Sequence, residues 1–166
     1  MSEESWGTLS EAIEEAALHL IEFRSREGEI LKEDVSKRVG LIRSFVSEVE
    51  KYEEERISSV RERIISKIKD VCQSYDENRL EQEIIFYVEK LDINEEKVRL
   101  RQHCQYFIET LEKEQYPGKK LGFIAQEMGR EINTMGSKAN HVEIQKWVVK
   151  MKDELEKIKE QSLNIL

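Results

Sequence analysis

Apolar residues recur every three or four positions along almost the whole chain, which is the spacing of one face of an α-helix. The first stripe contains Leu9, Ile13, Ala16, Ala17, Leu20 and Phe23, and it resumes with Leu31, Val35, Val39, Ile42, Phe45, Val46 and Val49. Thr8 and Glu11 have the spacing of a capping box, so we expect the first helix to begin there. Gly28 lies between the two runs, and we expect it to kink this helix without ending it.

Similar stripes predict helices through the rest of the sequence. They comprise residues 57–71, 80–88, 93–111, 121–135 and 144–165. Asp76, Asp92 and Asn140 each precede one of these stripes and have side chains that suit a helix N-cap. Gly136 follows the fourth stripe, where a glycine favours a helix C-terminus.

The composition agrees with long amphipathic helices, because 37% of residues are charged and only one proline and seven glycines interrupt the chain. We therefore predict an all-α fold, an elongated helical assembly with long coiled-coil-like helices and a smaller C-terminal helical bundle. Residues 1–75 would form a long helical arm that packs on itself or on a copy. Residues 76–166 would form a C-terminal helical domain.

The net charge of −8 argues against a protein that coats nucleic acid over its whole surface. Residues 117–140 reverse this sign, since four basic and two acidic side chains give +2, and they also contain four of the seven glycines. No apolar run reaches the roughly 18–20 residues of a membrane span. We expect a cytoplasmic protein with no membrane partner, in which Cys72 and Cys104 are reduced thiols.

Two carboxylates in the unusual segment have the spacing of a metal site. Glu127 and Glu131 are one helical turn apart, and oxygen ligands of this kind suit magnesium or manganese. His103 could add a nitrogen ligand or act as a general base, and it shares a helical stripe with Glu96 and Arg99. The plainer interpretations are a surface ion-pair ladder around Arg130 and a histidine that only packs between helices.

Basic residues on both sides of the acidic pair suggest a phosphate site. Lys119 and Lys120 precede a predicted helix, where ammonium groups and free backbone amides can together hold a phosphate, and Lys138 precedes the following helix. The alternative is that these lysines only keep the loops soluble.

Two motifs make the chain resemble the C-terminal part of the YicC-like endoribonuclease family. The first is QEMxRExNTxGSKA from Gln126 to Ala139, and the second is EExVRLRxH from Glu95 to His103. The resemblance implies a bacterial cytosolic endoribonuclease that uses a divalent metal, manganese especially, and forms a homo-oligomer, a hexamer in the full-length family. With the carboxylate chemistry above, the expected cofactor is manganese or magnesium. It also implies an N-terminal domain that this chain lacks, and Gly122 and Gly129 replace Asp and Asn of many relatives.

Carried over residue by residue, the resemblance also covers Asn133 and Ser137, and we combine it with the chemistry above to predict roles. The catalytic candidates are His103, Glu96 and Glu127. The candidates for binding RNA phosphate are Arg99, Arg101, Lys119, Lys120, Arg130 and Lys138. The metal candidates are Glu127, Glu131 and Glu95.

The leading hypothesis is a helical C-terminal segment of a metal-dependent endoribonuclease that cleaves single-stranded RNA phosphodiester bonds. Metal-activated water and attack by the RNA 2′-hydroxyl, with His103 as base, both remain open as mechanisms. The alternative is a non-catalytic oligomerisation and RNA-docking scaffold whose activity needs the N-terminal domain.

Overall fold

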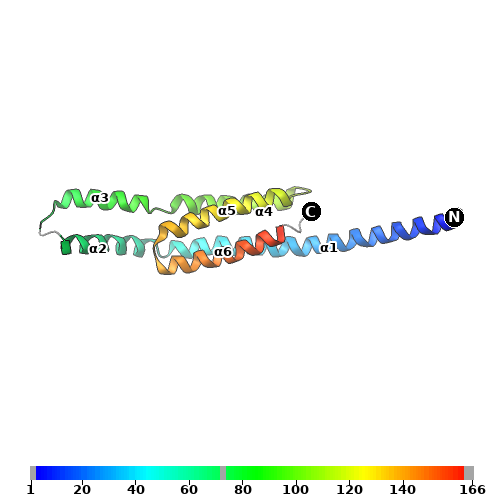
Figure 1. Ribbon diagram of the computed structural model, residues 1–166, viewed down its shortest axis with the longest axis horizontal. Coiled ribbons are helices and arrows are strands. Elements are labelled where there is room, and N and C mark those ends of the chain that lie inside the picture. Colours follow the sequence, from blue (N-terminus) through cyan, green and yellow to red (C-terminus); the bar gives the residue numbers. More distant parts are fainter. Residues whose placement is uncertain (1–2, 72–73, 163–166) are drawn as a thin grey trace.

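The computed structural model describes residues 3–71 and 74–162, and these residues form six helices and no strand (Figure 1). The helices are α1 (Glu3–Glu50), α2 (Glu53–Val71), α3 (Glu77–Lys90), α4 (Asn94–Lys113), α5 (Gly118–Ala139) and α6 (Val142–Ser162). The all-α prediction is confirmed. Gly28 lies inside α1, which continues through it as expected.

Four helices form an antiparallel bundle with one core. The C-terminal half of α1 packs against α6 and α4, and α5 closes the ring by packing against the same two helices. Figure 1 shows neighbouring helices of the bundle running in opposite directions. The fully buried core side chains include Val39, Ile42, Leu100, Phe107, Leu121, Met128, Ile132, Met135, Ile144 and Met151. The periodic apolar stripes of the sequence thus meet in one place.

Two extensions leave the bundle at opposite ends and make the molecule long (Figure 1). Helices α2 and α3 form a hairpin at one end, and the N-terminal half of α1 projects alone from the other. The predicted domain division at residue 75 falls in the α2–α3 connection. Val35–Val49, on the N-terminal side of that division, share a core with α4, α5 and α6.

The structure corrects four predicted helix ends and supports one. Ile93, and not Asp92, is the N-cap of α4, although Asp92 accepts a hydrogen bond of 3.3 Å from the amide of Asn94. Helix α1 begins at Glu3, so Thr8 lies within it and does not start it. Asp76 caps α3 as predicted, since its carboxylate accepts hydrogen bonds from the amides of Asn78 and Arg79. Helix α5 passes through Gly136 and ends at Asn140, which has a left-handed φ of 37° and is a C-cap and not the predicted N-cap.

The role of Gly136 is to let α5 and α6 approach each other. A Cβ atom built at this position would lie 3.0 Å from Val148 Cγ1, and one built at Gly129 would lie 3.2 Å from Leu155 Cδ2. The two glycines are seven residues apart on α5, and so are their neighbours on α6. They therefore mark one line of close helix contact, which a side chain would force apart.

The base of the α2–α3 hairpin is tied to the bundle by buried cations. Arg56, which is buried, donates a hydrogen bond of 2.8 Å to the carbonyl of Leu91. Lys97 of α4 donates one of 2.5 Å to Glu53 at the start of α2. These contacts connect the α1–α2 turn with the α3–α4 turn, where the chain passes between bundle and hairpin.

None of the described helices combines sufficient length with sufficient apolar character to cross a bilayer.

Replacing Phe107 by Ala should lower the free energy of unfolding by about 3–5 kcal/mol, because this ring is fully buried between the bundle helices. The matched control is Phe123→Ala on α5, where the ring is 64% exposed and the expected change is about 0.5 kcal/mol or less. Urea unfolding monitored by circular dichroism measures both. Equal effects of the two substitutions would contradict the proposed core.

Candidate functional site between helices α4 and α5

Ion pairs at both ends fix the register of α4 against α5. Lys138 of α5 donates a 2.7 Å hydrogen bond to Glu96 near the start of α4, and Lys120 of α5 pairs with Glu114, which caps the end of α4. Between these two pairs α4 advances by 18 residues while α5 goes back by 18. The two helices that carry the sequence motifs therefore run antiparallel in one register.

This register brings His103 to the level of Glu131. His103 lies seven residues after Glu96, and Glu131 lies seven residues before Lys138. Each therefore lies about two helical turns from the Glu96–Lys138 ion pair, in the same direction along the bundle. His103 is half-buried and Glu131 is almost buried. No ion pair within 4.0 Å joins them among the residues described. We call Glu96, His103, Glu131 and Lys138 the α4–α5 polar seam.

Glu96 is the most deeply placed acid of the polar seam. Its side chain is almost wholly buried, with 5% of the residue exposed. One carboxylate oxygen accepts the hydrogen bond from Lys138, and the other is buried without a hydrogen-bond partner. A buried carboxylate that keeps an unused acceptor is costly in free energy, so this residue stands out from the surface acids.

The second motif divides its residues among three sides of α4. Glu96 and His103 lie on the α5 side. Arg101 lies on the α1 side, where both its terminal nitrogens donate to Glu50 at 2.9 and 2.8 Å. Glu95 and Arg99 pair with each other on the exposed side. The structure thus brings together only part of the predicted set.

Most of the predicted phosphate-binding cations already have acidic partners. The pairs are Arg99 with Glu95, Arg101 with Glu50, Lys120 with Glu114, Arg130 with Glu127 and Lys138 with Glu96. The hydrogen bond to Glu114, followed by that to Tyr106, raises the pKa of Lys120. Arg101 lowers the pKa of Glu50 by its hydrogen bonds, which keeps that carboxylate charged. Phosphate would have to compete with these contacts.

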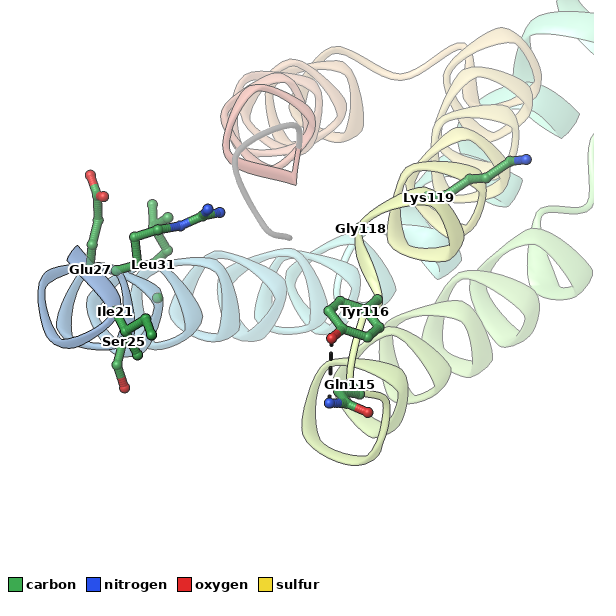
Figure 2. Close-up of a pocket in the computed structure, with 10 residues that line it drawn as sticks. Ile21, Ser25, Glu27, Leu31, Gln115, Tyr116, Gly118 and Lys119 are labelled. Carbon is green, nitrogen blue, oxygen red and sulfur yellow. Dashed lines mark hydrogen bonds between the residues drawn. The ribbon is translucent and has the colours of Figure 1, made fainter. Parts of the chain in front are cut away.

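Lys119 differs from the other five, since no ion pair to it is found in the described part of the chain. It lies at the rim of a hollow of about 1040 Å³ between residues 21–31 of α1 and the α4–α5 turn. Figure 2 shows its side chain directed away from Ile21 and Leu31 on the opposite wall. Lys119 is therefore available to solvent and does not close the hollow.

The predicted metal ligands do not form one cluster. Across residues 3–71 and 74–162, no three His, Cys, Asp or Glu side chains are grouped so that they could hold a metal ion. Glu127 pairs with Arg130 at 3.1 Å, and Glu95 pairs with Arg99 on the exposed side of α4. Glu131 has no such partner in the described part. The residues do not fit a preformed three-ligand site within one chain.

The cysteines add no second reactive group to this region. Cys104 is a free, buried thiol as predicted, and burial raises its pKa to about 12 although Arg43 acts in the opposite direction. It is protonated at neutral pH and is not a nucleophile. Cys72 lies outside the described residues.

Sequence reasoning missed the buried Lys97, which is 4% exposed. Its ammonium group lies 2.5 Å from Glu53 and 3.6 Å from Glu50. Lys97 therefore connects α4 with the last residue of α1 and with the first residue of α2. The sequence spacing of Lys97 does indicate that it is buried. Lys97 precedes the buried Cys104 and Leu111 by seven and fourteen residues and therefore occupies the same stripe.

The geometry defines an all-α protein in which two buried acids, a half-buried histidine and a half-buried lysine form a seam between two antiparallel helices. The sequence profile described as "Endoribonuclease YicC-like, C-terminal" matches residues 49–166, which include this seam. The chain belongs to this family. It is similar to proteins named "Probable endoribonuclease YicC" from Clostridioides difficile, with 42% identity over 163 residues, and from Haemophilus influenzae, with 31% identity over 154 residues.

These similarities extend over nearly all of the chain but only part of the relatives. They include 96% of this chain and 56% of the Clostridioides difficile protein, and 93% and 54% for the Haemophilus influenzae protein. The chain therefore spans a little over half the length of the curated relatives that it matches.

Replacing Lys138 by Met should lower the free energy of unfolding by about 2 kcal/mol, because Glu96 would keep a buried charge without its ionic hydrogen bond. Lys146→Met is the matched control, since Lys146 pairs with Glu143 on the exposed surface and should contribute about 0.5 kcal/mol or less. Adding Glu96→Gln to Lys138→Met should restore part of the loss. Urea unfolding of the unmodified protein, the two single variants and the double variant measures these changes, and a Lys138→Met effect no larger than the control would contradict the proposed pairing.

Proposed function

We propose that this chain is the helical part of an endoribonuclease that cleaves single-stranded RNA, and that the α4–α5 polar seam contributes to its active site. The observation that carries this proposal is that the two separate sequence motifs meet along one register, with His103 at the level of Glu131. Membership in a family described as endoribonuclease YicC-like supports RNA as the substrate.

The seam offers the groups that phosphodiester cleavage requires. The imidazole of a histidine can accept the proton of an attacking hydroxyl, and His103 is the histidine of the seam. The attacking oxygen then forms a bond to phosphorus while the RNA 5′-oxygen leaves with its electron pair. In this proposal Glu96 and Glu127 orient the reacting groups, and the RNA 2′-hydroxyl and water remain alternative attacking groups.

The phosphate contacts would begin at Lys119, which is free of an acidic partner in the described residues. The other five cations would bind phosphate by exchanging their carboxylates for it, because both are anionic oxygen acceptors. Such an exchange depends on ionic strength. Cleavage at a seam of this kind would therefore weaken as salt concentration rises.

Dependence on manganese or magnesium remains a prediction from the family resemblance. Glu127 and Glu131 supply two carboxylates one turn apart, and magnesium often binds through one or two carboxylates and several waters. Because a complete ligand set is not found in the described chain, no step above is assigned to a metal. A homo-oligomer, hexameric in the full-length protein, likewise remains a prediction.

Substitution of His103 by Ala should reduce cleavage of a labelled single-stranded RNA by about 100-fold or more, because it removes the proposed base. His19→Ala is the matched control, since His19 lies on the exposed part of α1 far from the seam. The rate is measured with and without manganese, for the 166-residue chain and for the full-length protein carrying the same substitutions. Loss of manganese stimulation in Glu131→Gln would support the metal prediction.

Three results would change this assignment. Normal cleavage by full-length His103→Ala protein would show that His103 is not the base. Binding without cleavage by the 166-residue chain, together with normal cleavage by full-length His103→Ala and Glu127→Ala proteins, would support the scaffold alternative. Cleavage that is equally lost in His19→Ala would indicate a general defect and contradict a specific role for the seam.

A further inference from the structure

A hollow of about 690 Å³ lies at the α5–α6 turn, on the end of the bundle from which the hairpin extends (Figure 1). It is lined by residues 140–142 and by Gln145, Lys146, Val149 and Lys150 of α6. Pockets that bind small molecules have volumes of roughly 300–1,000 Å³, so a single small ligand fits this space. We call it the α6 hollow.

The apolar part of this lining is open to water. Val142 and Val149 are 71% and 64% exposed, and they lie seven residues apart, on one side of α6. Ligand pockets combine an apolar surface of this kind with a few polar groups that fix the orientation of the ligand. The two valines therefore suit the flat apolar face of a small ring system.

The charged groups of the lining are all basic. No Asp or Glu is among the described residues that line the α6 hollow, although the whole chain has a net charge of −8. Lys146 pairs with Glu143 at 2.7 Å, whereas no ion pair of Lys150 is found in the described residues. The Lys150 ammonium lies 3.9 Å from the centre of the Trp147 ring. Lys150 is therefore available to an anionic ligand.

Three further side chains add hydrogen-bonding groups. The amide of Asn140, which is exposed, can both donate and accept. The amide nitrogen of Gln145 donates to the carbonyl of Gly136, which leaves the amide oxygen as an acceptor. The His141 ring packs against Tyr52 at 5.7 Å with its Nδ1 buried, so it contacts a ligand through Nε2. Donors and acceptors of this kind match the edges of a nucleobase.

We propose that the α6 hollow binds one nucleotide of the single-stranded RNA substrate, next to the α4–α5 polar seam. The base lies against Val142 and Val149, and Lys150 binds its phosphate. An unstacked nucleotide combines an apolar ring, hydrogen-bonding edges and an attached anion, which are the three features that the lining complements. This inference rests on the proposed function, because it takes RNA as the ligand.

The α6 hollow and the seam lie at the same end of α5. Asn140 follows Lys138 by two residues, and Lys138 binds Glu96 near the start of α4. An RNA strand with one nucleotide in the hollow can therefore continue toward Lys138 and the seam. The residues of the hollow hold the substrate and take no part in the chemistry assigned to His103.

An acidic protein helix is the other ligand that a basic and apolar surface can attract. Such a helix docks through apolar contacts that repeat every three or four residues. On this side of α6 the positions three and four residues after Val142 are Gln145 and Lys146, which are polar. The lining therefore favours a nucleotide, and an acidic peptide serves as the competing probe.

The first test compares two exposed lysines of α6 for which the described residues show no ion pair. Lys150 lines the hollow and Lys152 does not. Lys150→Gln should raise the dissociation constant of RNA at least about fivefold, because it removes the phosphate contact, while Lys152→Gln should change it less than about twofold. Fluorescence anisotropy measures both at one salt concentration without divalent metal. The probe is a labelled oligonucleotide of six adenosines with 2′-O-methyl groups.

The second test compares two exposed valines. Val149→Ser should raise the same dissociation constant at least about threefold, because it removes part of the apolar contact with the base, and Val98→Ser on α4 should leave it unchanged. Neither valine is buried, so thermal unfolding followed by circular dichroism should be the same for both variants.

The third test uses Trp147 as a reporter in a Trp6→Phe background, where it is the only tryptophan of the chain. Binding of the RNA probe should change its emission, because the phosphate draws Lys150 away from the ring. The midpoint should equal the anisotropy dissociation constant. Inorganic phosphate at the same concentration should leave the emission unchanged, since it has no base.

Equal weakening by Lys150→Gln and Lys152→Gln would overturn the proposal, and so would an unchanged dissociation constant in Val149→Ser. An equal emission change with inorganic phosphate would reduce the hollow to an anion site and overturn the nucleotide. Displacement of the RNA probe by a glutamate peptide of six residues at equal concentration would favour an acidic protein partner instead.

Failure of this inference can be separated from failure of the proposed function. Binding that depends on Lys150, together with normal cleavage by full-length His103→Ala protein, would contradict the proposed base and leave the nucleotide site standing. Cleavage that depends on His103, together with binding that is insensitive to Lys150 and Val149, would support the proposed function and overturn the nucleotide site.

Discussion

The antiparallel packing of α4 against α5 in a single register determines where the candidate site residues lie. The pairs Glu96–Lys138 and Glu114–Lys120 fix both ends of this register, and the apolar residues between them hold it in place. A shift of either helix by one residue would turn its seam residues by about 100° and separate them. The packing of the core and the chemistry of the seam are therefore the same constraint.

This constraint explains which parts of the fold could be predicted from the sequence. Apolar spacing identified the helices because each helix buries one stripe, and Asp76 identified the start of α3 because its cap is a local contact. The predicted role of Gly136 as a helix C-terminus was wrong, because the constraint that requires a glycine there comes from another helix. Gly136 accommodates Val148 of α6, and spacing along one helix contains no information about the neighbour that crosses it.

The same limit applied to the site. The stripe of Glu96 and His103 could be predicted from their separation of seven residues, since that spacing returns to one side of a helix. Their partners could not, because Lys138 meets Glu96 only once α5 has folded back along α4. Arg101 shows the difference most clearly. It belongs to the same motif as His103, but two positions of offset direct it to Glu50 of α1.

Helix α1 shows that one periodic pattern can have two physical outcomes. Beyond Val35 its apolar side chains are buried by α4 and α6, whereas from Trp6 to Ile30 similar side chains remain exposed. The difference is not in composition, since both halves alternate apolar and charged residues. It is in position, because the N-terminal half of α1 projects beyond the bundle and has no bundle helix beside it (Figure 1). A helix that keeps such a repeat beyond its own core presents an apolar face that the described chain does not cover.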